Sequence, residues 1–175
     1  METAVTSPGS KALVIALIMI VLNIVFYLLG VRGDSPLQYV MYGVLLIGVI
    51  ISINMFGKQI HYNATFGNYF AHGFKVSAIV TIIMIAYIVV FLFVFPEYKE
   101  KMIAEVEKKM RVKGKVSNEE ITQGMAMWRK GFIVITIAGT LLANLVFGVI
   151  ASLIGAAMTK KDKNNYQQDI SKIGS

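Results

Sequence analysis

The sequence contains no cysteine among its 175 residues. Without thiols the chain can form no disulfide, and it offers neither a thiolate nucleophile nor a cysteine ligand for a metal. The sequence also lacks the Gly-rich phosphate loop, the H-E-x-x-H zinc motif and the serine elbow of hydrolases. The two histidines, His61 and His72, would lie about 16 Å apart along a helix, too far to share one metal ion. We therefore expect no enzymatic activity, no metal site and no cofactor.

Charge is missing from four long apolar runs, residues 12–30, 37–57, 76–95 and 132–158. A helix of about 20 apolar residues crosses the hydrocarbon core of a bilayer. With 56% hydrophobic residues, the chain is predicted to be an integral membrane protein with four transmembrane helices. An ionisable group inside a span usually marks a proton relay or an ion pathway. The absence of such a group argues against an ion-coupled transporter but is compatible with a passive pore.

The predicted fold class is all-α, with the four transmembrane helices in an antiparallel bundle. The connection between the first two runs is only a few residues long, so these helices must form a hairpin. We assign residues 1–163 to a single membrane domain and residues 164–175 to a flexible polar tail. No internal repeat is evident.

The last run carries small residues four positions apart, and we expect its helix to be the seam against which the others pack. Lipid is as apolar as leucine, so helices associate in a membrane where small residues allow close approach. The predicted packing positions are Gly139, Ala143, Gly148, Ser152, Gly155 and Ala156.

Three asparagines, Asn23, Asn54 and Asn144, fall inside the predicted spans. An asparagine in hydrocarbon needs a hydrogen-bond partner. One interpretation is that these side chains bond neighbouring helices to one another. The other is that they contact a lipid headgroup or a small ligand along a polar path.

Two connections have patterns of their own. Residues 58–75 place Phe66, Phe70 and Phe74 four apart, which predicts a short interfacial helix running into the third span. Residues 97–130 read as an amphipathic insertion of two helices, with a capping box at Ser117 and Glu120 and with Trp128 at the interface. Methionines among its basic residues suit either a docking surface or a cover for the bundle.

The net charge is +7, and the basic residues flank the predicted spans. They are expected to meet the lipid bilayer and its anionic headgroups there, so we expect no nucleic-acid partner. More Lys and Arg lie on the side of the third connection, which favours termini outside. The lysines directly after the last span resemble a translocation stop, and on that basis we expect both termini to be cytoplasmic.

Two segments carry a resemblance to a known family. Residues 63–75 read N-A-T-F-G-N-Y-F-A-H-G-F-K, and residues 144–154 read N-L-V-F-G-V-I-A-S-L-I before a Lys-Lys stop. With the charged insertion between them, this layout resembles a family of small bacterial four-span membrane proteins catalogued as a domain of unknown function, number 4199. The resemblance implies a bacterial inner (plasma) membrane and this architecture, and it implies no functional residue.

We therefore expect a non-catalytic inner-membrane protein that acts through helix packing. It would be a homo-oligomer or an accessory subunit bound to another membrane protein. The alternative is a passive small-molecule or lipid transporter or channel subunit, with a polar path near Asn23, Asn54 and Asn144.

Overall fold

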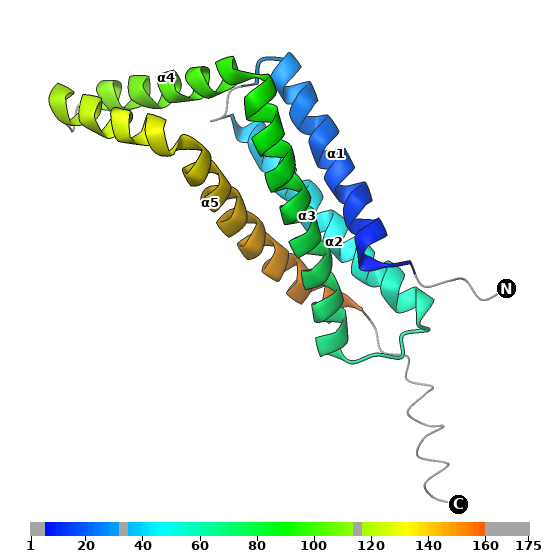
Figure 1. Cartoon of the computed structure of the whole chain (residues 1–175). Helices are drawn as coiled ribbons and strands as arrows, with labels where there is room; N and C mark the ends of the chain where they lie inside the picture. The colour runs from blue at the N-terminus through cyan, green and yellow to red at the C-terminus, as the bar shows by residue number, and fades with distance from the viewer. Residues whose placement is uncertain (1–5, 32–34, 114–116, 160–175) are drawn as a thin grey trace, which may run out of the picture. The chain divides into compact units, whose positions relative to one another are not determined.

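The computed structural model describes residues 6–31, 35–113 and 117–159. These residues form α1 (Pro8–Leu28), the 3₁₀ helix η1 (Pro36–Gln38), α2 (Tyr39–Gln59), α3 (Phe66–Val94), α4 (Pro96–Lys113) and α5 (Asn118–Met158) (Figure 1). None of the described residues belongs to a strand. The helices Pro8–Leu28, Pro36–Gln59, Phe66–Val94 and Asn118–Met158 are long and apolar enough to cross a membrane. The predicted all-α membrane fold with four spans is confirmed.

Local capping fixes several helix ends. Ser7 caps α1 by accepting a hydrogen bond from the Ser10 N–H, and α1 therefore begins at Pro8, before the predicted apolar run. Ser35 caps η1 in the same way, with Pro36 in its first turn. α3 ends at Val94, ahead of the Pro96 that opens α4. Residues 32–34, residues 114–116 and the predicted tail 164–175 lie outside the described residues.

The capping box predicted at the start of α5 is present. The Ser117 backbone N–H donates to Glu120 Oε2 at 3.0 Å, and the Glu120 N–H donates to Ser117 Oγ at 3.3 Å. The bond from the Ser117 backbone, followed by the bond from its hydroxyl, lowers the pKa of the Glu120 carboxyl from its usual value. This local motif fixes where α5 begins.

α3 and α5 are each longer than the predicted spans. Of the interfacial segment predicted at residues 58–75, residues 66–75 form the first turns of a continuous α3. α5 likewise runs without a break from the insertion into the fourth apolar run. Gly67 and Gly73 do not interrupt α3, although glycine costs about 1 kcal/mol in a helix interior.

The chain divides into two compact units, residues Met1–Ile83 with Ala143–Ser175 and residues Met84–Leu142. We call the first the bundle unit and the second the hairpin unit. The bundle unit holds α1, α2, the first part of α3 and the last part of α5. Its core is formed by fully buried side chains that include Leu45, Val49, Ile53, Tyr69, Val76 and Val80.

Small residues bring the helices of the bundle unit into close contact. A Cβ atom added at Gly148 of α5 would lie 1.8 Å from Ser77 Oγ of α3. One added at Gly155 would lie 3.3 Å from the Ile50 Cα of α2. Residues Gly148, Ala151, Ser152, Gly155 and Ala156 are all buried. The last part of α5 therefore packs through its small residues within the chain itself.

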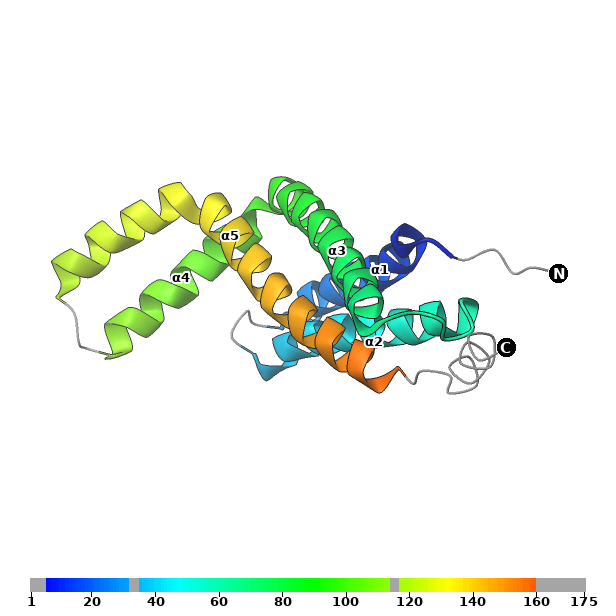
Figure 2. The same ribbon diagram turned by 90° about the horizontal axis from the view of Figure 1, so that it is seen from below.

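The hairpin unit has its own apolar cluster. Its buried members are Leu92, Ile103, Ile121, Met125 and Phe132, with Tyr98, Val106 and Trp128 among the side chains packed around them. α4 and the first part of α5 lie side by side in both views (Figures 1 and 2). The predicted amphipathic insertion is thus a helical hairpin with a buried apolar face.

Candidate ligand-binding pocket

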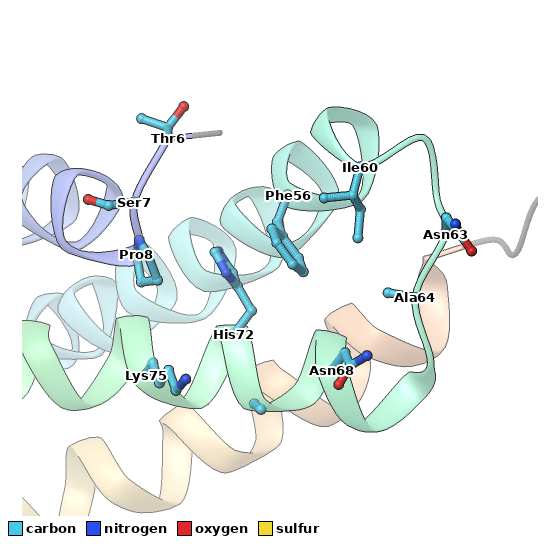
Figure 3. Close-up of a pocket in the computed structure, with 11 residues that line it drawn as sticks. Thr6, Ser7, Pro8, Phe56, Ile60, Asn63, Ala64, Asn68, His72 and Lys75 are labelled. Carbon is cyan, nitrogen blue, oxygen red and sulfur yellow. The ribbon is translucent and has the colours of Figure 1, made fainter. Parts of the chain in front are cut away.

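A cavity of about 580 Å³ opens in the bundle unit, where α1 and α3 begin and α2 ends. Pro8 from α1, Phe56 and Ile60 from α2 and its end, and His72 and Lys75 from α3 form its walls. Figure 3 shows the Phe56 and His72 side chains extending toward one another from α2 and α3. The remaining lining residues are Thr6, Ser7, Asn63, Ala64, Asn68 and Ala71.

The connection between α2 and α3 folds back over this end of the bundle unit. His61 and Tyr62 have positive φ angles of 52° and 56°, and the Tyr62 N–H donates to the Gly57 carbonyl at 2.7 Å. Two successive left-handed residues reverse the chain at the end of α2. Thr65 then accepts from the Asn68 N–H and caps the start of α3. This sharp turn brings Asn63 and Asn68 to the cavity.

Lys11 lies behind the cavity wall and is 7% exposed. Its ammonium donates to Gln59 Oε1 at 3.3 Å and to the Ser52 carbonyl at 3.5 Å. The same nitrogen lies 5.7 Å from the centre of the Phe56 ring, within the range of a cation–π contact. Within the described part of the chain, every one of these partners is neutral.

His72 joins α3 to α2. Its ring stacks on Phe56 with centroids 4.2 Å apart and an interplanar angle of 5°. Its Nε2 shares a 3.3 Å hydrogen bond with Ser52 Oγ. Lys11, Ser52, Phe56 and His72 therefore form one connected cluster, which we call the Lys11 cluster.

The Ser52–His72 pair resembles the nucleophile and base of a hydrolase, but its geometry favours packing. Ser52 is 2% exposed, so a substrate could not reach its hydroxyl without separating α2 from α3. Catalytic pairs of this kind also need a third group that orients the imidazole. In the described residues, no salt bridge or hydrogen bond joins His72 to a carboxylate.

The acidic residues of the described segments all lie in the hairpin unit, between Glu97 and Glu120. The lysines of the described bundle unit are Lys11, Lys58 and Lys75, and all three lie near the ends of α1, α2 and α3 that surround the cavity. This end of the bundle unit therefore carries positive charge without a carboxylate among its described residues. Such a site attracts anions.

The predicted packing positions fall into two groups. Gly148, Ser152, Gly155 and Ala156 are buried in the bundle unit, whereas Ala143 is half-buried and Gly139 is exposed. The Ser152 hydroxyl bonds the Gly148 carbonyl of its own helix at 2.6 Å. The buried group contacts α2 and α3 of the same chain.

The three intramembrane asparagines do not share one environment. Asn144 is buried, Asn23 is half-buried and Asn54 is exposed. The Asn144 amide nitrogen has no hydrogen-bond partner among the described atoms. None of the three lines the cavity described above, so a common polar path through them is not supported.

The predicted interfacial aromatics lie on two helices. On α3, Phe66 and Phe74 are exposed, and the half-buried Phe70 stacks on Phe74 with ring centroids 6.1 Å apart. Trp128 is half-buried on α5 and meets the Phe132 ring edge-on, with centroids 5.6 Å apart.

The sequence pattern did not predict the Lys11 cluster. It indicated only that His72 lies too far from His61 to share a metal ion and that basic residues such as Lys11 flank the spans. One signal was present, because Ser52, Phe56 and Gln59 follow one another at helical spacing and share a face of α2. Such a polar and aromatic face at the end of a span predicts a buried polar contact.

The family comparison matches residues 11–161 with the model described as Protein of unknown function (DUF4199). No curated protein and no solved structure matches the chain. Apart from residues 8–10 at the start of α1, the matched region contains the four apolar helices, together with the hairpin unit and all residues of the Lys11 cluster. The chain is therefore a multi-pass membrane protein that belongs to this family of unknown function, DUF4199.

Proposed function

We propose that this protein is a non-catalytic subunit that acts by binding another integral membrane protein through its hairpin unit. The hairpin, α4 with residues 118–130 of α5, is the one sizeable polar segment among the described residues. The partner is a different protein in an accessory complex or a second copy of this chain. The observation that carries the proposal is that large apolar side chains of the hairpin remain exposed.

That surface remains after the hairpin has formed its own core. Ile103 and Ile121 are buried between the two helices, so one face of each helix is already covered. Val112 and Met127 are nevertheless 79% and 76% exposed, and Met110 is also exposed. Flexible methionine side chains adapt to irregular partner surfaces. These exposed apolar side chains are available for contact with a partner protein.

Two ion pairs join charged residues of the hairpin. Arg111 forms a 2.8 Å salt bridge with Glu107 on α4, and Arg129 of α5 pairs with Glu100 of α4. Exposed pairs of this kind contribute at most about 1 kcal/mol each to stability. The Arg129–Glu100 pair joins α5 to α4, whereas the Arg111–Glu107 pair lies within α4.

The non-catalytic part of the proposal is supported by the cavity. Among the described residues, its lining offers an imidazole and an ammonium without a carboxylate. Ser52, the serine that shares a hydrogen bond with His72, is buried. A pocket of this composition can hold a ligand, but it has no arranged pair of acid and base.

Photocrosslinking tests the hairpin contact. A photoreactive residue placed at Val112 or Met127 in cells is expected to give a discrete product of higher mass. The same residue at Ile82, which is 67% exposed on α3, is the control and should label only lipid. A product that contains a second, differently tagged copy indicates self-association, and one that contains another protein indicates an accessory role. Equal yields from Val112, Met127 and Ile82 would exclude the hairpin as the contact surface.

We further propose that the membrane is the bacterial inner membrane and that both termini are cytoplasmic. With four crossings, the connection after α2 then faces the cytoplasm and the hairpin faces outward. The basic flank that follows the last span supports this direction.

Cysteine labelling tests the orientation cleanly, because the chain has no cysteine of its own. In intact cells a membrane-impermeant thiol reagent is expected to label a Gln123→Cys variant of the hairpin. It should label a Lys58→Cys variant only after permeabilisation. Both positions are exposed, so the two variants differ mainly in the side of the membrane on which the introduced cysteine lies. The reverse pattern would place the termini outside.

A further inference from the structure

We propose that the cavity between α1, α2 and α3 binds the phosphate of an anionic phospholipid headgroup. This goes beyond the proposed function, because the cavity lies in the bundle unit and the proposed protein contact lies in the hairpin unit. The inference rests on a buried lysine with neutral partners, on the cavity beside it and on the depth of the cavity in the membrane.

Lys11 supplies the first argument. A buried ammonium group is costly unless a charge partner or a full set of hydrogen bonds compensates for its lost hydration. Lys11 has two rather long bonds, to Gln59 and to the Ser52 carbonyl, and the face of Phe56. In the described residues no carboxylate accompanies them. An external anion close to this group would supply the missing compensation.

The cavity supplies the place for that anion. Lys75 lines it directly, and Phe56 is the wall that also contacts the Lys11 ammonium. The amides of Asn63 and Asn68 add hydrogen-bond donors at the opposite side (Figure 3). A volume of about 580 Å³ falls in the usual range for small-ligand sites, about 300–1,000 Å³.

The depth and lining of the cavity favour a lipid over a soluble anion. The cavity lies where the charge-free part of α2 ends, at Gly57, and where that of α3 begins, at Val76. This is the level at which headgroups lie and at which basic pockets between membrane helices bind them. Ile60, Ala64 and Ala71 give one part of the lining an apolar surface, which suits the glycerol and the first carbons of an acyl chain.

The test uses the full chain purified in a neutral detergent, with binding measured by native mass spectrometry. The probes are short-chain phosphatidylglycerol, phosphatidylcholine with the same acyl chains, and inorganic phosphate. We expect phosphatidylglycerol to bind at least tenfold more tightly than phosphatidylcholine, with inorganic phosphate binding weakest. A Lys75→Met variant, in which an exposed side chain is replaced, should lower the phosphatidylglycerol affinity about tenfold and retain the parent's thermal stability. Lys11→Met should lower the affinity at least as much.

Lys58→Met is the matched control, because it removes the same charge from an exposed lysine at the same end of the bundle unit but outside the cavity lining. It should bind phosphatidylglycerol as the parent does. Asn68→Leu, which changes the cavity without changing the charge, should weaken binding. The proposal is overturned if the three lysine variants lose affinity equally, since that indicates a general charge effect. It is also overturned if phosphatidylcholine or inorganic phosphate binds as tightly as phosphatidylglycerol.

Discussion

A Gly148→Leu variant is expected to lose most of the packing between α3 and α5 and to unfold at a temperature about 10 °C lower than the parent. The added Cβ would lie 1.8 Å from Ser77 Oγ and 2.7 Å from Ser77 Cβ, so the two helices must move apart. Overpacking of a core costs about 1–3 kcal/mol, and more where atoms cannot yield. In a chain of this size each kcal/mol shifts the unfolding midpoint by about 2–4 °C. The midpoint can be followed by circular dichroism in detergent.

Gly139→Leu is the control for this prediction. Gly139 belongs to the same helix and to the same apolar run, but it is exposed, and an added Cβ would meet nothing within 4 Å. The same substitution should leave the midpoint unchanged or raise it slightly, because glycine is the poorer helix former.

A second pair of variants identifies the atoms whose contact destabilises the Gly148→Leu variant. Gly148→Ala should be destabilised through contact with Ser77, and Ser77→Gly in the same chain should restore much of the loss. Equal midpoints for Gly148→Leu and Gly139→Leu would show that α3 and α5 do not approach one another closely at this position.

An Ile103→Ala variant should loosen the hairpin without unfolding the bundle unit. Ile103 is fully buried in the apolar cluster that joins α4 to α5. Truncating such a side chain to alanine costs about 2–5 kcal/mol. This is a large fraction of the free energy that stabilises a short helical hairpin. We expect proteases to cleave the segment between residues 97 and 130 at least tenfold faster than in the parent.

The fluorescence of the chain's one tryptophan, Trp128, provides a direct measure of this change. Trp128 packs against the hairpin cluster and against Phe132, so its emission should shift to longer wavelength as the cluster opens to water. Val112→Ala is the matched control, since Val112 lies on the same helix but is 79% exposed. Parent-like emission and cleavage in Ile103→Ala would contradict the assigned core of the hairpin unit.

Features that depend on residues close in the sequence were predictable. The capping box at Ser117 and Glu120 joins residues three positions apart, and its hydrogen bonds follow from helix geometry alone. The hairpin also follows from local periodicity, because Ile121 and Met125, which lie four positions apart and so share one face of a helix, are buried together.

Features that depend on distant residues were not predictable. Lys11 meets Ser52 and Gln59 across more than forty positions of sequence, and His72 meets Ser52 from another helix. Helical periodicity shows which residues share a face, but it does not show which face of another helix lies opposite. The same limit applied to the small residues of α5, whose pattern indicated close packing without indicating the partner.

The continuity of α3 shows tertiary packing prevailing over local preference. Glycine disfavours a helix interior, yet a Cβ added at Gly73 would lie 2.5 Å from the Ile53 side chain and 2.8 Å from Ser152 Oγ. α2 and α5 both press against this position, and a glycine allows them to approach without breaking α3. The contacts that replace its missing side chain offset the helix propensity that glycine lacks.

By itself the sequence determined that this chain is a membrane protein that crosses the bilayer four times. Each charge-free run is long enough to span the hydrocarbon core. As a helix, each run also pairs its backbone polar groups internally, which lipid requires. Only the tertiary structure decided which side chains the four helices bring together. It turned the small residues of α5 inward and assembled a buried lysine beside a polar cavity, because contacts between helices depend on the shapes of facing surfaces that no single run of sequence contains.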